Sequence, residues 1–185
     1  MLNDALNEAR GKMERAVEVL QRDLAGIRTG RASPGLVERL RVDYYGPPTL
    51  LNQLASISTP EPRLLIIRPW DVNALPDIEK AILRSDLGLM PSNDGRLIRL
   101  AIPPLTEERR RELVKVVGRR LEGARVAIRN CRRQALEDLR ELQSEKLVTE
   151  DDFFRGRDDL QEVTDEFIEK VNKLGKAKEA EIMEI

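Results

Sequence analysis

Residues 106–142, TEERRRELVKVVGRRLEGARVAIRNCRRQALEDLREL, decide the fold. This stretch has no proline, and its apolar residues recur at steps of three and four, which places them on one stripe of a helix. The stripe consists of Val114, Val117, Leu121, Ala124, Ile128, Cys131, Ala135, Leu139 and Leu142. The steps are close to a heptad seam, so we expect one long amphipathic helix of about 40 residues, or about 60 Å. Thr106 is its expected N-cap, followed by two acids in the first turn.

Two further segments show the same periodicity. Residues 1–29 carry the stripe Leu2, Leu6, Ala9, Met13, Ala16, Leu20, Leu24 and Ile27, and the breaker cluster 30–35 ends it. A last helix follows the expected cap Thr149, with the stripe Leu160, Val163, Phe167, Val171 and Leu174. Gly156 and Gly175 are expected to weaken this helix locally. Each stripe must be buried, and an elongated three-helix bundle is the simplest solution.

The middle segment is of a different kind, because all ten prolines lie between Pro34 and Pro104. Strands are expected at 37–45, 54–58, 64–68 and 97–102, a helix at 74–87, and a hairpin-like turn at 91–95. The predicted fold class is α+β: a small β/α/β domain, 30–105, inserted into a bundle formed by 1–29 and 106–185. The two crossings near 30–35 and 102–105 are rich in glycine or proline, so we expect a hinge there.

Composition excludes several functional classes. The chain has 185 residues with no histidine and a single cysteine, so His-based acid–base chemistry, catalytic triads, His metal sites and internal disulfides are excluded. The acidic N-terminus does not match a signal peptide, and no apolar run is long enough for a membrane span. We expect a cytoplasmic protein with no catalytic residues, metal site or cofactor.

The strongest candidate site is a cluster of bases in the long helix. Residues 109–133 hold ten bases and two acids, and six of the bases fall within about 60° of one line on a helical wheel. These six are Arg111, Lys115, Arg125, Arg129, Arg132 and Arg133. Arginine forks match phosphate oxygens, so one interpretation is a structured RNA. The alternative is that the last helix supplies the anions, because residues 150–185 carry twelve acids and six bases, or that the stripe is merely solvated.

Other candidates favour structural roles. The 29–34 loop, which contains Arg31, reads as an ordinary turn and lacks the Gly-Lys-Ser/Thr ending of a P-loop. The acids 150–152 are expected to be a helix cap, and Cys131 a buried small apolar residue. The aromatic residues Tyr44, Tyr45 and Trp70 are expected to pack in the small domain.

Several blocks of the sequence resemble one known family. They are IRTGRASP at 27–34, YYG at 44–46, QLAS at 53–56, EKAI at 79–82, SDLGL at 85–89, PPLTEERR at 103–110 and ARVAIRN at 124–130 with Arg132 and Arg133. In order and spacing, these blocks resemble the bacterial ribosome recycling factor. The resemblance implies an L-shaped, tRNA-like molecule with a hinged small domain.

The resemblance also implies a function. Such a factor releases ribosomes from mRNA after termination, splitting the post-termination complex into subunits together with elongation factor G and GTP, without being an enzyme. It implies a monomer that binds rRNA of the large subunit and no membrane. The implied RNA-binding residues are Arg110, Arg129 and Arg132, with Arg133, Arg28 and Arg31 as weaker correspondences. Arg110 falls toward the apolar side of the wheel, so it is expected to leave the bundle at its end.

The expected hinge residues are Gly30, Arg31, Ala32, Ser33, Pro34, Pro103, Pro104 and Leu105. Two other functional classes remain alternatives on the residues alone. A helical scaffold or co-chaperone would use the basic stripe on an acidic protein. An enzyme of the α/β unit has little support, because no acid–base or phosphate-cradle pattern occurs there.

Overall fold

The computed structural model describes residues 1–184, and Ile185 lies outside the described residues. The chain separates into two compact units. The helical unit consists of Met1–Leu24 and the chain from Arg111 onward, and the small unit is Ala25–Arg110. From sequence, the boundaries were placed at 29/30 and 105/106.

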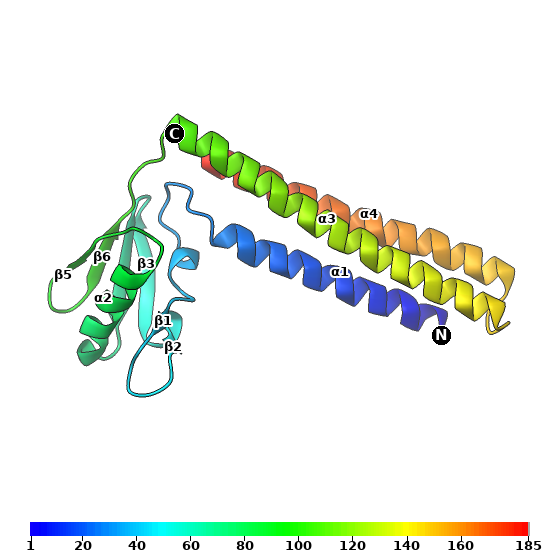
Figure 1. Ribbon diagram of the computed structural model, residues 1–185, viewed down its shortest axis with the longest axis horizontal. Coiled ribbons are helices and arrows are strands. Elements are labelled where there is room, and N and C mark those ends of the chain that lie inside the picture. Colours follow the sequence, from blue (N-terminus) through cyan, green and yellow to red (C-terminus); the bar gives the residue numbers. More distant parts are fainter. Residues whose placement is uncertain (185) are drawn as a thin grey trace. The chain divides into compact units, whose positions relative to one another are not determined.

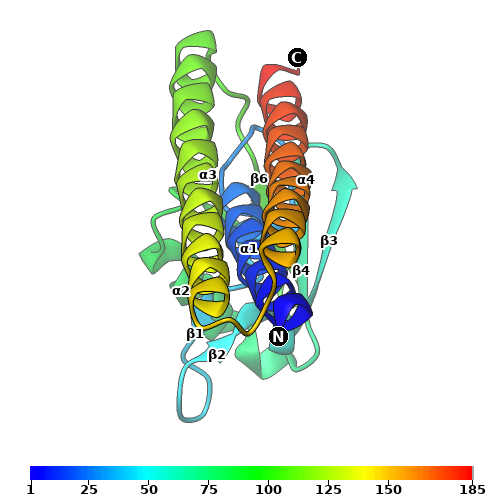
Figure 2. The same ribbon diagram turned by 90° about the vertical axis from the view of Figure 1, so that its right-hand side faces the viewer.

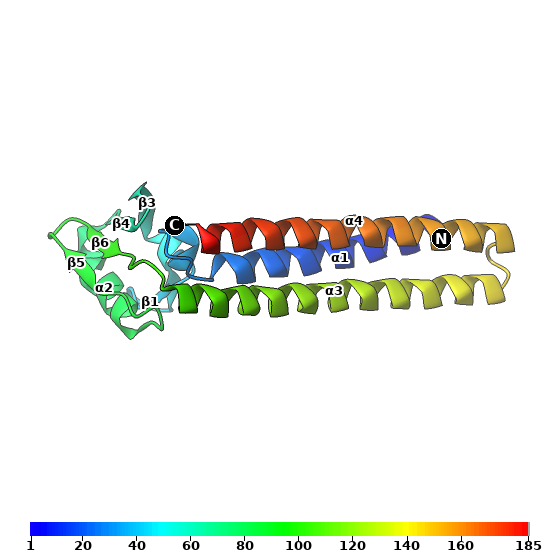
Figure 3. The ribbon, with the colours of Figure 1, turned by 90° about the horizontal axis from the view of Figure 1, so that it is seen from above.

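Three long helices form the helical unit (Figures 1 and 2). They are α1 (Leu2–Ala25), α3 (Glu107–Ser144) and α4 (Glu150–Met183). Figure 3 shows that α3 runs antiparallel to both α1 and α4. For α3 and α4 this follows from the short connection between Ser144 and Glu150. The expected long second helix is confirmed, with 38 residues.

The first helix is shorter than its pattern predicted. It ends at Ala25, so Ile27 lies outside it. Gly26 follows the last helical residue, and glycine in a helix costs about 1 kcal/mol relative to alanine. Beyond it, Nη1 of Arg28 donates to the carbonyl of Leu87 in the small unit at 2.8 Å, which fixes the chain in a non-helical path.

Both predicted helix caps are present. The backbone N–H of Arg109 donates to Oγ1 of Thr106 at 3.1 Å. Thr149 and Asp152 form a capping box, in which the Thr149 hydroxyl accepts from the Asp152 N–H at 3.1 Å and the Asp152 carboxylate accepts from the Thr149 N–H at 3.3 Å. The acids 150–152 therefore belong to a helix cap, as expected: Asp152 takes part in the capping box, and all three complement the helix dipole.

The predicted stripes of α1 and α3 are confirmed at most positions. At two positions the buried residue is the neighbour of the predicted one: Val17 is buried instead of Ala16, and Leu113 is buried instead of Val114. A wide apolar face offers two neighbouring residues at such places, and only packing against the partner helices selects one. The buried apolar residues of these two helices are Ala9, Met13, Val17, Leu20, Leu24, Leu113, Val117, Leu121, Ala124, Ile128, Ala135 and Leu139.

The stripe of α4 differs more from its prediction. Leu160, Phe167 and Val171 are buried as expected. Val163 and Leu174 are only half-buried, and the small residues Gly156, Thr164 and Gly175 take the inner positions. The hydroxyl of Thr164 donates to the carbonyl of the residue one turn earlier at 2.8 Å, so its burial leaves no unsatisfied polar group.

The two glycines of α4 allow the helices to approach closely. A Cβ on Gly156 would lie 2.8 Å from Cδ1 of Leu2, and one on Gly175 would lie 2.3 Å from Cδ1 of Leu121. Each glycine therefore accepts a leucine from a neighbouring helix. The expectation that these glycines only weaken the helix is incomplete, because their missing side chains make room for core packing.

The small unit is built on an antiparallel four-stranded sheet in the order β3-β4-β6-β5. Its strands are β3 (Ala55–Glu61), β4 (Leu64–Pro69), β5 (Pro91–Asn93) and β6 (Ile98–Ala101). A short pair, β1 (Arg41–Val42) with β2 (Thr49–Leu50), and the helix α2 (Leu75–Arg84) complete it, with 3-10 turns at Pro34–Leu36, Leu51–Gln53 and Val72–Ala74. Ile78 and Ile82 of α2 belong to the same buried core as alternate residues of β4 and β6.

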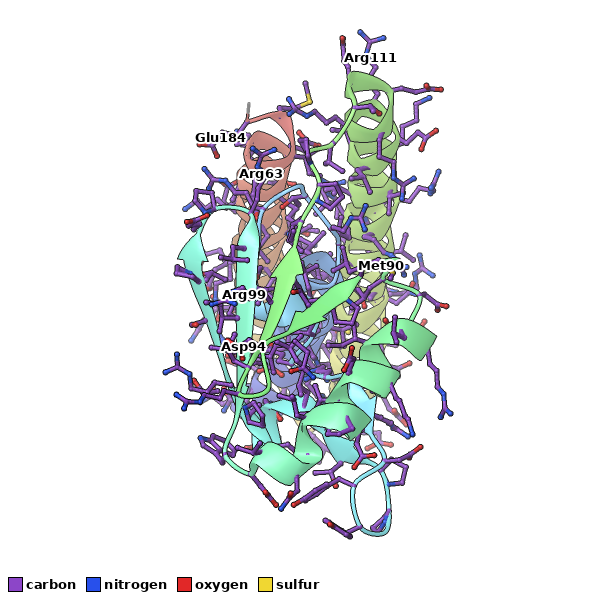
Figure 4. The ribbon with its side chains drawn as sticks, turned by 90° about the vertical axis from the view of Figure 1, so that its left-hand side faces the viewer. Arg63, Met90, Asp94, Arg99, Arg111 and Glu184 are labelled. Carbon is purple, nitrogen blue, oxygen red and sulfur yellow. The ribbon has the colours of Figure 1, made fainter. Side chains whose placement is uncertain are left out.

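Two predictions for this unit are wrong. The expected strand 37–45 is reduced to Arg41–Val42, because the chain before it closes into the 3-10 turn capped by Ser33. The expected turn 91–95 begins with strand β5, which pairs with β6, and the turn proper is held by the Asp94 carboxylate. Figure 4 shows Asp94 and Arg99 at this end of the sheet. Nη1 of Arg99 lies 3.5 Å from Oδ2 of Asp94.

We predict that Gly175→Ala destabilises the helical unit, because the new methyl group forces the buried Leu121 out of its position. Overpacking typically costs 1–3 kcal/mol, and the higher helix propensity of alanine recovers about 1 kcal/mol of it. Gly118→Ala in α3 is the matched control, because nothing lies within 4 Å of its added Cβ. Urea unfolding should show a lower free energy for the first variant and a higher one for the second; a gain for Gly175→Ala would contradict the packing.

Candidate RNA-binding face

The candidate site is the face of α3 that carries the predicted arginines. Arg129 and Arg133 are exposed, and Arg125 and Arg132 are half-buried along the edge toward α4. We call these four residues the arginine face. The helical spacing of 125, 129, 132 and 133 places them together, as the periodicity predicts.

Two residues of this face share one carboxylate. Oε1 of Glu122 accepts from Nη1 of Arg129 at 3.0 Å, and its Oε2 accepts from Nη1 of Arg125 at 3.3 Å. The hydrogen bonds from Arg129 and Arg125 hold the pKa of the Glu122 carboxyl below its usual range. Glu122 thus relieves the repulsion between two like charges one helical turn apart.

The partners that α4 provides are amides. Nε and Nη2 of Arg125 both donate to Oδ1 of Asn172, at 3.2 and 2.8 Å. Nη1 of Arg132 donates to Oε1 of Gln161 at 3.1 Å. Arg133 has no hydrogen bond or ion pair with any described residue.

These contacts bear on the alternative in which the acidic last helix neutralises the stripe. For the four residues of the arginine face, the only carboxylate partner within the described chain is Glu122, which lies on α3 itself. The acids of α4 therefore do not neutralise this face. Sequence reasoning did not assign roles to Glu122, Asn172 and Gln161. The spacing of Glu122 from Arg125 and Arg129 on the same helix was a signal for Glu122, whereas nothing in the sequence pairs the α4 residues Asn172 and Gln161 with arginines of α3.

The remaining predicted RNA-binding residues have other surroundings. Arg110, in the first turn of α3, is half-buried, and its Nε is buried without a hydrogen-bond partner. Arg28 belongs to the small unit and is held by the Leu87 carbonyl. Arg31 is exposed in the same unit. Their contact with RNA stays a prediction.

The predicted hinge segments are partly anchored within the small unit. The N–H of Ala32 donates to the carbonyl of Pro62 at 2.7 Å, and that of Ile102 donates to the carbonyl of Arg63 at 2.8 Å. Both crossings are thus attached to the turn between β3 and β4. The two crossings also meet, since a Cβ on Gly30 would lie 3.2 Å from Cγ of Leu105.

Gly30 is needed at this meeting point for a second reason. Its φ of +78° lies in the left-handed region, which side chains other than glycine rarely adopt. Pro103 and Pro104 are exposed and belong to no helix or strand, and Pro34 opens the 3-10 turn. The backbone around Ala32–Pro34 is therefore fixed, and the less anchored parts are Gly26–Ile27 and Pro103–Leu105.

The aromatic residues of the small unit correct one expectation. Tyr44 packs against the core, and its hydroxyl donates to Asp71, which raises the pKa of Tyr44 to about 12. Tyr45 is 85% exposed and Trp70 is 68% exposed, so these two do not pack inside. Pattern alone did not reveal this, because an aromatic side chain next to a turn can point either way.

No other chemistry emerges from the described residues. Within residues 1–184, no group of three or more His, Cys, Asp or Glu side chains is arranged to hold a metal ion. Cys131, which the sequence predicts to be buried, is only half-buried, and its thiol is free. The helices of the described chain are all too short or too polar to pass through a lipid bilayer.

Comparison with known proteins decides the relationship. The family model described as "Ribosome recycling factor" matches residues 20–183. The chain belongs to this family. It is 56% identical to the ribosome-recycling factor of Carboxydothermus hydrogenoformans and 55% identical to that of Roseiflexus sp. (strain RS-1), over all of both chains in each case.

Solved structures of the ribosome recycling factor family agree. The solution structure of a ribosome recycling factor is similar with a TM-score of 0.82 and 47% identity, covering 100% of this chain and 98% of that one. A second has a TM-score of 0.72 and 49% identity over 100% of both chains. This second structure consists of models for the T. thermophilus ribosome recycling factor and the E. coli elongation factor G bound to the E. coli post-termination complex. The family consists of translation factors that are not enzymes, which excludes the enzyme alternative.

We predict that Glu122 adds a pH-dependent contribution to stability. Its pKa is lowered from 4.5 in the folded chain, so the contribution is present above that value and is lost as the pH falls through the lower, folded pKa. Glu122→Gln should therefore show a smaller fall in Tm than the parent chain between about pH 5 and pH 3. Glu137→Gln, also exposed on α3 but without a bonded partner in the described chain, is the control. Parallel Tm curves for parent and Glu122→Gln would contradict the assignment.

Proposed function

We propose that this chain releases ribosomes from mRNA after termination and splits the post-termination complex into subunits together with elongation factor G and GTP. The observation that carries the proposal is the family match over residues 20–183, supported by identities above 50% along the whole chain. A similar protein is described on the post-termination complex with elongation factor G, which supports these partners. In this role, the proposed factor is a cytoplasmic monomer that makes and breaks no covalent bond.

We further propose that the arginine face binds rRNA of the large subunit, with Arg129, Arg132 and Arg133 as its main contacts. Guanidinium groups recognise phosphate through paired N–H donors, and folded RNA presents phosphates at fixed spacing. Arg110, in the first turn of α3, is proposed as a separate RNA contact. Arg28 and Arg31 are secondary contacts of the small unit.

The small unit is proposed to move on its two connections. The residues predicted for the hinge lie in segments 30–34 and 103–105. The hydrogen bonds of Ala32 and Ile102 to the β3–β4 turn favour a pivot outside them, toward Gly26–Ile27 and Pro103–Leu105. The effect of elongation factor G binding would then reach the ribosome through movement of the small unit.

The deciding experiment is a splitting assay on post-termination ribosomes with elongation factor G and GTP. We expect subunit release only when this protein is present, and Arg132→Ala should weaken binding to large subunits on the order of tenfold at moderate salt, because a phosphate contact is lost. Its Tm should change little. Arg22→Ala, an exposed arginine of α1 with no partner in the described chain, is the matched control.

The splitting assay also tests the proposal against its alternatives. Absence of splitting with the parent chain would contradict the function. Splitting with undiminished binding by Arg132→Ala would contradict the role of the arginine face. A helical scaffold would bind neither subunits nor intact ribosomes, even at low salt.

The hinge predicts a broad distribution of distances between the units. Spin labels at Arg140 in α3 and Ser92 in β5, in a Cys131→Ala background, should give a wide distribution by pulsed electron paramagnetic resonance. A pair within the helical unit, Arg140 and Asp158, should give a narrow one. A single sharp distance for the first pair would contradict the hinge.

A further inference from the structure

The seam between α3 and α4 places an amide opposite each of two arginines. Arg125 and Arg132 are seven residues apart on α3, the spacing that returns a helix to the same face. Oδ1 of Asn172 accepts two hydrogen bonds from Arg125, and Oε1 of Gln161 accepts one from Arg132. The same kind of contact therefore repeats along the seam.

Each of the other two seams of the bundle has an arginine paired with a carboxylate. Between α1 and α4, Nη1 of Arg10 lies 3.3 Å from Oε1 of Glu166. Between α1 and α3, Nη1 of Arg120 lies 3.9 Å from Oδ2 of Asp23. Opposite charges at the flanks of packed helices are the usual arrangement, so the amides beside the arginine face are the exception.

The exception is not caused by a shortage of acids, because residues 150–185 hold twelve of them. One of them, Asp165, lies one turn from Gln161 and accepts a hydrogen bond from its Nε2 at 2.9 Å. The amide thus stands between an acid and Arg132. Its nitrogen is bound to the acid and its oxygen to the guanidinium, so its orientation is fixed at both ends.

An amide and a carboxylate of the same shape differ in one respect that matters here. Both accept a hydrogen bond from a guanidinium, but only the carboxylate cancels its charge. Arg132 uses Nη1 alone within the described chain, which leaves Nε and Nη2 for an external acceptor. Arg125 has Nε, Nη1 and Nη2 all bonded, so Arg132 has more capacity left to bind phosphate.

We propose that Gln161 is a positioning residue of the RNA-binding face: it holds Arg132 in a fixed orientation while leaving the positive charge of Arg132 available to phosphate. Asn172 orients Arg125 in the same way, but that arginine also pairs with Glu122. This inference rests on the proposed function of the arginine face. A side chain that is oriented before binding loses less rotamer freedom on binding, so the amides raise affinity without touching RNA.

The test is the isosteric change Gln161→Glu, measured as binding to isolated large ribosomal subunits over a salt series. The new carboxylate pairs with Arg132, so we expect affinity to fall several-fold and the slope of log K against log salt to shrink by up to about 1. Tm should change little, because the ion pair gained with Arg132 is offset by repulsion between the new carboxylate and Asp165, which loses its hydrogen bond from the amide. A purely structural role would lower Tm and affinity together.

Two variants separate orientation from charge. Gln161→Leu removes the hydrogen bond but adds no charge, so affinity should fall modestly with an unchanged salt slope. Gln21→Glu changes the net charge by the same amount on an exposed residue of α1 without a partner in the described chain, and should leave both affinity and slope unchanged. An equal effect of Gln21→Glu and Gln161→Glu would overturn the inference.

A double-mutant cycle with Arg132→Gln distinguishes the two levels of the proposal. If Gln161 acts through Arg132, Gln161→Glu should have little further effect in the Arg132→Gln background. If Arg132→Gln alone leaves binding intact, the proposed role of the arginine face fails. If Arg132→Gln weakens binding but Gln161→Glu does not, or does so equally in both backgrounds, only the positioning role is overturned.

Discussion

The close packing of α4 against its two partner helices is the constraint on which the helical unit depends. Gly156 and Gly175 receive leucine side chains from α1 and α3, and the buried Thr164 satisfies its own hydroxyl within the helix. Small residues at inner positions bring the helix axes near enough for the polar flanks to meet. The hydrogen bonds from Arg125 to Asn172 and from Arg132 to Gln161 depend on this approach.

Charge is distributed to match that packing. The long helix is basic and the last helix is acidic, yet the arginine face stays cationic, because the neighbouring acceptors on α4 are neutral amides. Only Glu122 provides a negative charge there, and it is shared between two arginines. A helix pair that was optimised for stability alone would place carboxylates along this seam. Because these acceptors are neutral, they leave the positive charge of Arg132 uncancelled.

In the small unit, backbone hydrogen bonds fix the two segments by which the chain enters and leaves it. The turn between β3 and β4 binds both Ala32 and Ile102, so the two crossings leave the sheet side by side. Gly30 fits against Leu105 because it has no side chain and has a positive φ. Any motion of this unit must therefore begin in the short stretches beyond these bonds, Gly26–Ile27 and Pro103–Leu105, rather than around Ala32–Pro34.

The sequence by itself determined the three amphipathic helices, both threonine caps, the insertion of a small α/β unit and the cluster of arginines on α3, because periodicity and local capping chemistry depend on neighbours in the chain. It failed where the outcome depended on distant residues. The tertiary structure alone decided that Val17 rather than Ala16 faces inward, that 91–93 form an edge strand, and that Tyr45 and Trp70 are exposed. It also decided that Asn172 and Gln161 face Arg125 and Arg132, because the register of two antiparallel helices follows from how their cores interlock.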